Sequence, residues 1–356
     1  MSVLKNLHKD YNPIVILAES GLLCEELNNH KIEYHVIPLA KLFSSSFSIN
    51  FIINLPYSIY SSLKAITKII NDRKIDLVYT NTLSIFIGGI WAKLNNAYHI
   101  WHVREIITDS KILQIICSIY LQVFSDKIIC NSEATRKRVI KYIKYLQKKT
   151  IVIHNGVETI NVKNRIRGKQ RTITLIGRIN SWKGQSLFIS AVNQLISQIP
   201  NKLNNISFLI VGSPYRTQED LLHKLQSKIN SISLNKYIKI VPYTKNIEDI
   251  YSISNIIVIP SAKPEPFGLV AIEGMSCSKA IIAANHGGLK EIVKHGKTGY
   301  LFNPNDLTDF TKYLKILILN KSKCDEFGKQ GKIRFNKLFL VNQYSSKINE
   351  ILSNIN

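Results

Sequence analysis

The stretch Asn255-Ile-Ile-Val-Ile-Pro260-Ser-Ala-Lys-Pro-Glu265-Pro-Phe-Gly268-Leu-Val-Ala-Ile-Glu273 reads as a buried strand, a proline-rich loop and the start of a helix. A helix that begins near Gly268 presents unpaired N–H groups and the positive end of its dipole, which suits a phosphate. Gly268 would also let a ligand approach the backbone closely. A carboxylate such as Glu273 can accept hydrogen bonds from both hydroxyls of a ribose. Taken alone, the two glutamates have a simpler explanation, with Glu265 as a helix cap and Glu273 solvated.

Short β-branched segments, each followed by a helical stretch, recur along the whole chain. In the first half the expected strands are Ile14–Leu17, Glu33–Ile37, Asp76–Tyr79, Tyr98–His102, Lys127–Cys130 and Ile151–Ile153. In the second half they are Thr172–Ile176, Ser207–Val211, Ile238–Val241, Ile256–Ile259, Ala280–Ala283 and Tyr300–Phe302. Most are apolar nearly throughout, as parallel strands covered on both faces are. The alternation predicts doubly wound α/β sheets.

The alternation breaks once, in the polar, basic segment ETINVKNRIRGKQ between Val157 and Arg171. This segment reads as a linker between two α/β domains of similar size. Ligands of such folds bind where loops leave the carboxyl ends of the strands, so we expect a ligand-binding cleft. The expected boundaries are 1–160 for the first domain, 161–170 for the linker, 171–338 for the second domain and 339–356 for a C-terminal helix.

Further strand–glycine–helix junctions accompany the first one. Gly177-Arg178 follows the strand Thr172–Ile176, and Lys183-Gly184 then opens a helix. Two cations at the end of a strand can neutralise a diphosphate. Gly212 ends the next strand, and Asn285-His-Gly-Gly-Leu-Lys-Glu291 is a glycine turn that enters another helix. Each junction alone is common and weak.

Together and in this order, these motifs resemble the retaining GT-B glycosyltransferases of the large family four. The similarity runs from about Ile151 to Phe302 through H-N-G-V, G-R-x-x-x-x-K-G, E-P-F-G-L-x-x-x-E, G-G-x-x-E-I-V and G-x-T-G-Y-L-F. The two glutamates with P-F-G between them are its most specific element. The resemblance implies two Rossmann-like domains that face each other across a cleft. It also implies that the final helix, 339–356, returns to the first domain.

The resemblance assigns roles to individual residues. Glu265 would lie against the sugar hydroxyls as a catalytic residue. The donor, a nucleotide-diphosphate sugar, would be held by Arg178, Lys183, Phe267, Gly268, Leu269 and Glu273, with Gly177 and Gly212 nearby. In that family the anomeric configuration is retained without a metal or a cofactor, and the leaving phosphate helps to deprotonate the acceptor.

The N-terminal domain would meet the acceptor. His102 ends the strand Tyr98–His102 and resembles the family's active-site histidine near the sugar, with Glu105 beside it. The alternative is a satisfied histidine at the end of a strand. Asn131 lies at a second such junction, where the plainer interpretation is a helix capped by Ser132 with Glu133 just inside.

The start of the chain departs from the family pattern. Members normally open with a strand, a glycine-rich loop and a long helix before the equivalent of Pro13–Ala18. Here Met1–Asp10 reads like the end of that helix, so we expect the opening strand and loop to be absent. The first domain would then lack a strand in the middle of its sheet, or would have closed the gap by pairing the neighbours directly.

Charge and cysteines bear on partners and location. The chain has a net charge of +23 and five scattered cysteines, an odd number without a C-x-x-C pair. The charge favours anionic partners, and the cysteines favour a reducing cytoplasm. No signal peptide is apparent at the start.

A basic stretch, 136–149, reads as a helix with an apolar stripe at Val139, Ile140, Ile143 and Leu146. Its cations would either form a solvated face or lie against anionic lipid at the inner face of the membrane.

The leading hypothesis is a retaining, hexosyl-type transferase that builds a cell-surface polysaccharide or glycolipid on a saccharide or lipid-linked acceptor. One alternative is a nucleotide-sugar epimerase of the same fold, for which no acid and base carboxylates stand out in the first domain. The other is an inactive nucleotide-sugar-binding remnant. Nucleic-acid binding would rest on charge alone, because no binding motif accompanies it.

Overall fold

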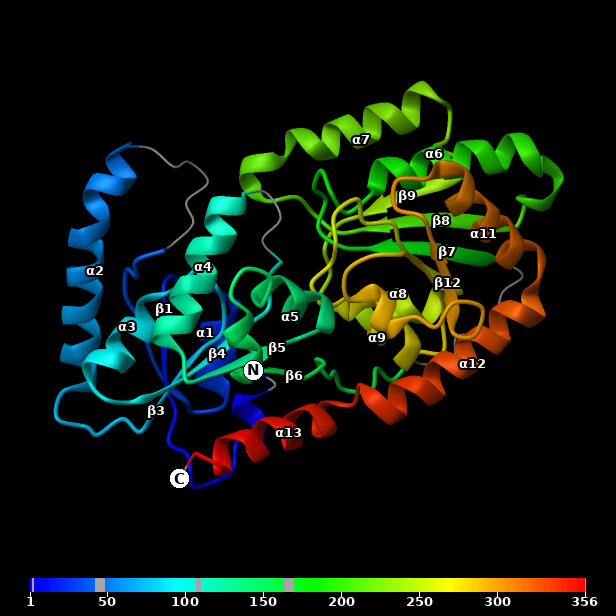
Figure 1. Cartoon of the computed structure of the whole chain (residues 1–356). Coiled ribbons are helices and arrows are strands. Elements are labelled where there is room, and N and C mark those ends of the chain that lie inside the picture. The colour runs from blue at the N-terminus through cyan, green and yellow to red at the C-terminus, as the bar shows by residue number, and fades with distance from the viewer. Residues whose placement is uncertain (2, 42–48, 107–109, 163–169, 356) are drawn as a thin grey trace. The chain divides into compact units, whose positions relative to one another are not determined.

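The computed structural model describes residues 1, 3–41, 49–106, 110–162 and 170–355. The chain divides into two compact units (Figure 1). Unit 1 consists of Met1–Gly156 and Val341–Asn356, and unit 2 of Val157–Leu340. Most of the expected linker, residues 163–169, lies outside the described residues.

Unit 2 is a doubly wound α/β domain with a fully parallel sheet in the order β12-β11-β10-β7-β8-β9. Its strands are β7 (Arg171–Ile176), β8 (Ile206–Val211), β9 (Ile238–Val241), β10 (Ile256–Ile259), β11 (Ala280–Ala284) and β12 (Gly299–Phe302). Its helices are α6 (Gln185–Gln198), α7 (Asp220–Ser231), α8 (Ile247–Ile253), α9 (Leu269–Ser276), α10 (Leu289–Ile292), α11 (Leu307–Leu319) and α12 (Lys321–Leu338). All six strands predicted in this half are present.

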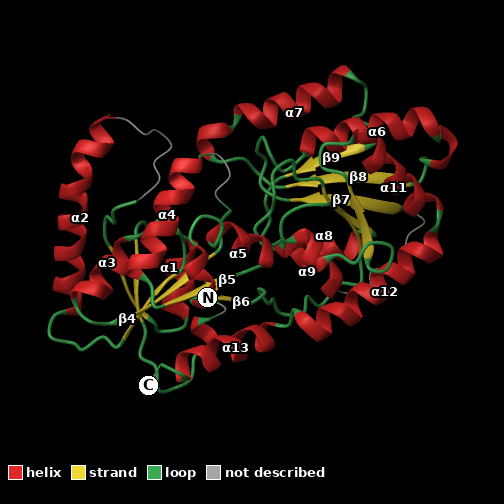
Figure 2. Ribbon diagram, in the orientation of Figure 1, coloured by secondary structure: helices red, strands yellow, loops and turns green. Residues whose placement is uncertain are grey.

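Both faces of this sheet are buried, which explains why most residues of its strands are apolar. Ile256 and Val258 of β10 pack into the core that contains Phe188 of α6 and Phe310 of α11. The alternate residues of β10 pack into a second core with α9, α10 and α12. Helices therefore cover the sheet on both sides, as Figure 2 shows.

Unit 1 contains two separate parallel sheets. One has the order β3-β4-β5-β6, and the other pairs β1 with β2. The strands are β1 (Ile14–Leu17), β2 (Glu33–Val36), β3 (Leu77–Thr80), β4 (Tyr98–Val103), β5 (Lys127–Cys130) and β6 (Thr150–Val152).

The sequence predicted either a missing central strand or direct pairing across the gap. Ile14 and Ile16 of β1 share a core cluster with Val78 of β3. Nevertheless, within the described residues no strand pairs with the second edge of β1 or of β3. Direct pairing of the two neighbours is therefore not what the structure has.

The helices of unit 1 are α1 (Leu22–Asn29), α2 (Ile49–Ile70), α3 (Ile87–Leu94), α4 (Lys111–Phe124), α5 (Glu133–Val139) and α13 (Val341–Ser353). Trp101 of β4 packs into a cluster with residues of α2 and α4. Its neighbour Ile100 points to the opposite face, where it packs with Ile348 and Leu352 of α13. The last helix thus completes the core of unit 1, and its Asn349 donates a hydrogen bond of 2.8 Å to the Asn6 carbonyl.

Two local predictions are wrong. The basic stretch 136–149 is not one helix, because α5 ends at Val139 and only a short 3-10 helix, Lys144–Lys148, follows. Ile143 lies between them with an extended backbone. Its side chain and that of Leu146 therefore still pack in the core of unit 1, ahead of β6. The N-terminal segment is not the end of a long helix either, but contains a single 3-10 turn, Leu4–Asn6. In the described part of the chain, no helix is both long enough and apolar enough to cross a membrane.

Candidate functional site

Two charged side chains meet at the carboxyl edge of the unit 2 sheet. Lys183 Nζ lies 2.6 Å from Glu265 Oε1, and both side chains are largely buried. Lys183 follows β7 and Glu265 follows β10, which are neighbours in the sheet at the point where the strand order reverses. Ligands of doubly wound folds bind at this position. The structure therefore brings together two of the residues that the sequence singled out.

Backbone contacts hold the two loops together. The Asn180 carboxamide oxygen accepts hydrogen bonds from the backbone N–H groups of Trp182 (3.1 Å) and Lys183 (2.9 Å). The Ala262 N–H donates to the Trp182 carbonyl at 2.7 Å. Gly184 has a φ of +82°, and a Cβ there would lie 1.9 Å from the Pro260 carbonyl oxygen. Only glycine permits this approach of the β7 loop to the end of β10.

Glu265 is fixed by further bonds. Ser261 donates from its hydroxyl to Glu265 Oε1 at 2.6 Å. The Gly288 N–H, in the glycine turn after β11, donates to the Glu265 backbone carbonyl at 2.8 Å. His286 Nε2 lies 2.9 Å from the Ser261 carbonyl oxygen. The loops after β7 and β10 thus meet at the Glu265 carboxylate, and the loop after β11 holds the backbone beside it.

Arg178 lies at the same edge but makes different contacts. Its guanidinium stacks on the Tyr215 ring, 3.8 Å from the centroid, and contacts the Tyr215 hydroxyl. The guanidinium is exposed, whereas the Arg178 carbonyl accepts a hydrogen bond of 2.9 Å from Gln185. Gly177 and Gly212 lie at the ends of β7 and β8, where a Cβ on Gly212 would be 2.1 Å from the Gly177 carbonyl oxygen. They let the two strand ends lie close together.

Helix α9 begins directly after the Glu265 loop. Phe267 is buried and Leu269 is 42% exposed. A Cβ on Gly268 would meet Leu289 at 2.6 Å, so this glycine serves helix packing as well as any approach of a ligand. The N-cap residue of α9 is Gly268, which has no side chain with which to cap the helix.

Glu273 lies one turn further along α9 and has a partner that the sequence did not indicate. The hydroxyl of buried Tyr251, on α8, donates to Glu273 Oε2 at 2.7 Å. Burial raises the pKa of the Glu273 carboxyl, and the hydrogen bond from Tyr251 opposes that shift. One carboxylate oxygen is therefore held while the group keeps further acceptor capacity for a ligand.

The predicted acceptor-side residues belong to unit 1. His102 is completely buried, and its Nδ1 lies 2.7 Å from the Tyr79 hydroxyl. The Tyr344 ring of α13 covers it, with ring centroids 6.4 Å apart. Burial lowers the pKa of His102 to about 3, so the imidazole is neutral near pH 7. Its Nε2 is buried without a hydrogen-bond partner in the described part of the chain, so the core satisfies only one of the two ring nitrogens.

Glu105 and Asn131 fasten loops at the carboxyl edge of the unit 1 sheet. Glu105 Oε2 accepts hydrogen bonds from the backbone N–H groups of Leu83 and Arg104, both at 3.1 Å. Asn131 is buried, and its Oδ1 accepts a hydrogen bond of 2.8 Å from Thr135. Ser132 caps α5 by accepting from the Thr135 N–H at 3.0 Å, which confirms the plainer interpretation of that junction.

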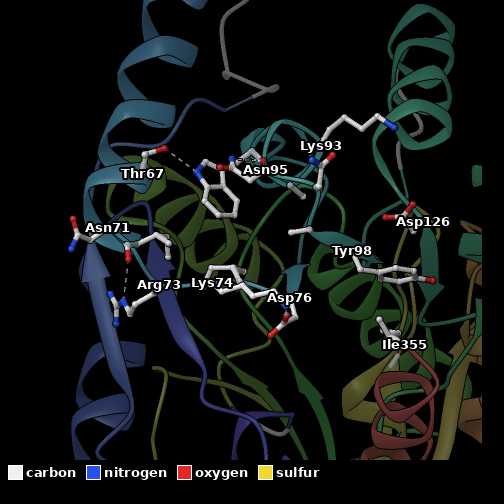
Figure 3. A pocket seen from close by; sticks show the side chains of 16 residues that line it. Thr67, Asn71, Arg73, Lys74, Asp76, Lys93, Asn95, Tyr98, Asp126 and Ile355 are labelled. Atoms are coloured by element: carbon white, nitrogen blue, oxygen red, sulfur yellow. Dashed lines mark hydrogen bonds and ion pairs between the residues drawn. The ribbon is translucent and has the colours of Figure 1, made fainter.

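A cavity of about 830 Å³ lies elsewhere in unit 1, at the amino ends of β3 and β4 (Figure 3). Several polar groups that line it are engaged with one another or with nearby residues. Thr67 accepts from the Trp91 indole at 3.1 Å, Arg73 pairs with Glu33 at 2.9 Å, and Lys74 pairs with Asp76 at 3.2 Å. It contains none of the predicted site residues. No group of three or more His, Cys, Asp or Glu side chains that could hold a metal occurs in the described ranges.

Comparison with known families agrees with the two-unit division. The family model described as glycosyl transferases group 1 matches residues 156–334, which is half of the chain. This chain belongs to that family. A second model, glycosyltransferase family 4, matches residues 20–160.

Relatives of this group 1 glycosyltransferase include an uncharacterized glycosyltransferase of Methanocaldococcus jannaschii, 27% identical over 86% of each chain. A D-inositol 3-phosphate glycosyltransferase of Gordonia bronchialis is 29% identical over 45% of this chain and 35% of that protein. The solved structure of Anabaena HepE in complex with UDP and glucose has a TM-score of 0.82 and 22% identity, covering 99% of this chain and 95% of that one. A glycosyltransferase of Rickettsia africae has a TM-score of 0.80 and 22% identity, covering 97% and 90%. These two likenesses establish the GT-B fold, with two Rossmann-like domains.

Within this glycosyltransferase, the sequence interpretation missed the residues that position the charged groups: Asn180, Tyr215, Tyr251 and Ser261. Ser261 directly follows the strand-ending Pro260, so its place at the site could have been found from the sequence. Tyr251 precedes Glu273 by 22 residues on a different helix, and no spacing rule links the two.

Proposed function

We propose that this glycosyltransferase binds a nucleoside-diphosphate sugar at the carboxyl edge of unit 2 and transfers the sugar with retention of configuration. The acceptor in this proposal is a saccharide or lipid-linked precursor of a cell-surface polysaccharide or glycolipid. The observation that carries the proposal is the contact of Lys183 with Glu265 across the ends of β7 and β10. A cation and a carboxylate at this position suit the phosphate and the sugar hydroxyls of one donor.

In the proposed reaction, negative charge develops on the diphosphate as the bond to the sugar breaks. Lys183 and Arg178 stabilise this charge, because preorganised cations act strongly on charge that appears in the transition state. Lys183 exchanges its contact with Glu265 for one with the phosphate, which frees Glu265 to accept hydrogen bonds from the sugar. Glu273, held by Tyr251, accepts from the ribose. The leaving phosphate takes up the acceptor proton, without a metal.

We also propose that the enzyme works in the cytoplasm, at the inner face of a membrane where lipid-linked acceptors lie. All five cysteines are free thiols, and burial raises the pKa of Cys117 to about 12. Buried neutral thiols are unreactive and fit a reducing compartment. The net charge of +23 favours anionic lipid.

Calorimetric titration with UDP, GDP and ADP tests the donor site, beginning with UDP because the Anabaena structure holds it. The proposal expects one nucleoside diphosphate to bind, and Lys183→Met to weaken that binding. Incubation with the matching nucleotide sugars, followed by NMR of the anomeric proton of any product, tests transfer and its stereochemistry. Failure of every nucleoside diphosphate to bind, or a product with inverted configuration, would contradict the proposal.

One observation favours the alternative of a nucleotide-sugar-binding protein without turnover. In the described residues β1 and β3 each lack a strand partner on one edge, so the strands of unit 1 form two sheets instead of one. Tight binding of a nucleoside diphosphate without transfer to any acceptor would favour this alternative.

A further inference from the structure

Helix α4 of unit 1 has an unusual outer face. Ile112, Ile119 and Val123 are exposed by 70%, 50% and 51%, and Ile115 and Ile116 by 40% and 42%. These residues follow the i, i+3, i+4, i+7 spacing of a single helical stripe. By contrast, Gln114 and Ser118 point into the protein. Exposed apolar residues normally occur singly, and a continuous stripe marks a contact surface.

Helix α2 carries a second exposed stripe. Ile53, Tyr57 and Tyr60 are exposed by 68%, 73% and 63%, at the i, i+4, i+7 spacing. The buried sides of α2 and α4 share one core cluster, which contains Leu121 of α4 and against which Leu55 of α2 packs. In Figure 1, α2 and α4 lie next to α3 in unit 1. The two stripes together are called the α2–α4 surface below.

The charged residues within α2 and α4 are all lysines. The sequence contains neither Asp nor Glu in residues 34–71 or 110–125. Lys64 and Lys68 continue the α2 stripe at i+4 and i+8 from Tyr60, and Lys111 precedes the α4 stripe. All three lysines are exposed.

We propose that the α2–α4 surface docks on an anionic lipid bilayer, with the isoleucines in the acyl boundary, the tyrosines at the headgroups and the lysines against the lipid phosphates. This combination of an apolar stripe, aromatic residues and lysines is that of interfacial helices. A second copy of the chain is a poorer occupant, because like-charged lysines would then approach one another in a protein of net charge +23. The inference rests on the membrane location proposed above and names the surface responsible.

Vesicle flotation of the full chain tests this inference. Vesicles of phosphatidylcholine and phosphatidylglycerol in equal parts are compared with pure phosphatidylcholine. We expect binding to the anionic vesicles that weakens at high salt. Ile112→Gln with Ile119→Gln should reduce the vesicle partition coefficient at least tenfold, because glutamine keeps the helix but removes the apolar surface. Tyr57→Gln with Tyr60→Gln is a second, independent pair with the same expected direction.

Leu319→Gln with Ile333→Gln is the matched control, since these unit 2 residues are exposed by 51% and 53%. This pair should bind vesicles like the unaltered chain. Absence of binding to anionic vesicles overturns the inference, and so does binding by both the α2 and the α4 variant that equals that of the unaltered chain. So does light scattering that shows a dimer of the unaltered chain and a monomer of the α4 variant, because the surface would then join two copies. Titration with UDP on every variant keeps this outcome separate from the donor-site proposal, since loss of vesicle binding should leave nucleotide affinity unchanged.

Discussion

Replacing Tyr251 by Phe removes one hydroxyl from the interior of unit 2 and leaves its shape nearly unchanged. The lost bond is 2.7 Å long and ends on a carboxylate whose pKa burial already raises. A hydrogen bond to a charged group is worth about 1.5–3 kcal/mol, and one between neutral groups about 0.5–1.5 kcal/mol. We therefore expect Tyr251→Phe to lower the free energy of unfolding by about 1.5–3 kcal/mol above the folded pKa of Glu273, with pH 8 as the upper point of the measurement.

The effect should depend on pH with a definite sign. A carboxyl whose pKa is raised on folding stabilises the protein at low pH and loses this contribution as the pH rises through its folded pKa. Removing Tyr251 raises the pKa of Glu273 further, so the variant loses more stability than the unaltered chain as the pH rises. At pH 4, with Glu273 protonated, the loss should shrink to about 0.5–1.5 kcal/mol.

Urea denaturation at the two pH values, followed by circular dichroism, measures this difference from the shift in midpoint. In a Glu273→Gln background the same substitution should cost about 0.5–1.5 kcal/mol at both pH values, which completes a double-mutant cycle. An equal loss at pH 4 and pH 8 in the unaltered background would refute the reasoning, because the hydroxyl would then not serve the charged form.

Four further outcomes are expected. Lys183→Ala should weaken UDP binding and leave uridine almost unaffected in calorimetry; equal losses for the two ligands would remove the lysine from the phosphate role. Glu273→Ala should weaken binding of both ligands by about 1.5–3 kcal/mol, because the lost hydrogen bonds go to the ribose. His102, with a pKa of about 3 in the folded state, stays neutral while the unfolded chain takes up a proton near pH 6.5. Stability should therefore fall as the pH drops below 6.5, by up to about 1.4 kcal/mol per pH unit for this group, and His102→Gln should flatten that loss in urea denaturation. Ile348→Ala should destabilise unit 1 by about 2–5 kcal/mol, as truncation of a buried isoleucine does, measured by the same method.

The sequence predicted unit 2 well because its signals are local. Most strand residues of that unit are apolar, and each functional junction is a strand end followed by glycine and a helix. Lys183 and Glu265 could be assigned to one donor site from the resemblance, but their direct contact was not predicted. What the sequence did not reveal is which strands are adjacent, and so which loops touch.

Unit 1 was harder because its decisive features depend on tertiary context. The stripe of Val139, Ile140, Ile143 and Leu146 fits a helix, yet the chain buries the same residues in a helix, an extended residue and a 3-10 turn. Helical spacing alone cannot separate these arrangements. The sequence of a strand also does not reveal whether neighbouring strands pair with both of its edges. In the described residues, β1 and β3 each pair on one edge only.

The return of α13 to unit 1 has a consequence for the order of events during synthesis. Unit 1 needs Tyr344, Ile348 and Leu352 to cover one face of its sheet, but these residues are made after the roughly 180 residues of unit 2. At about 5–20 residues per second, a ribosome takes roughly 10–40 s to cover that distance. During this interval the nascent unit 1 lacks the cover of Ile100 and Ile129, whereas every residue of unit 2 has been made once Leu340 is added. The half of the chain that is translated first is therefore the half that is finished last, and it depends longest on protection from aggregation.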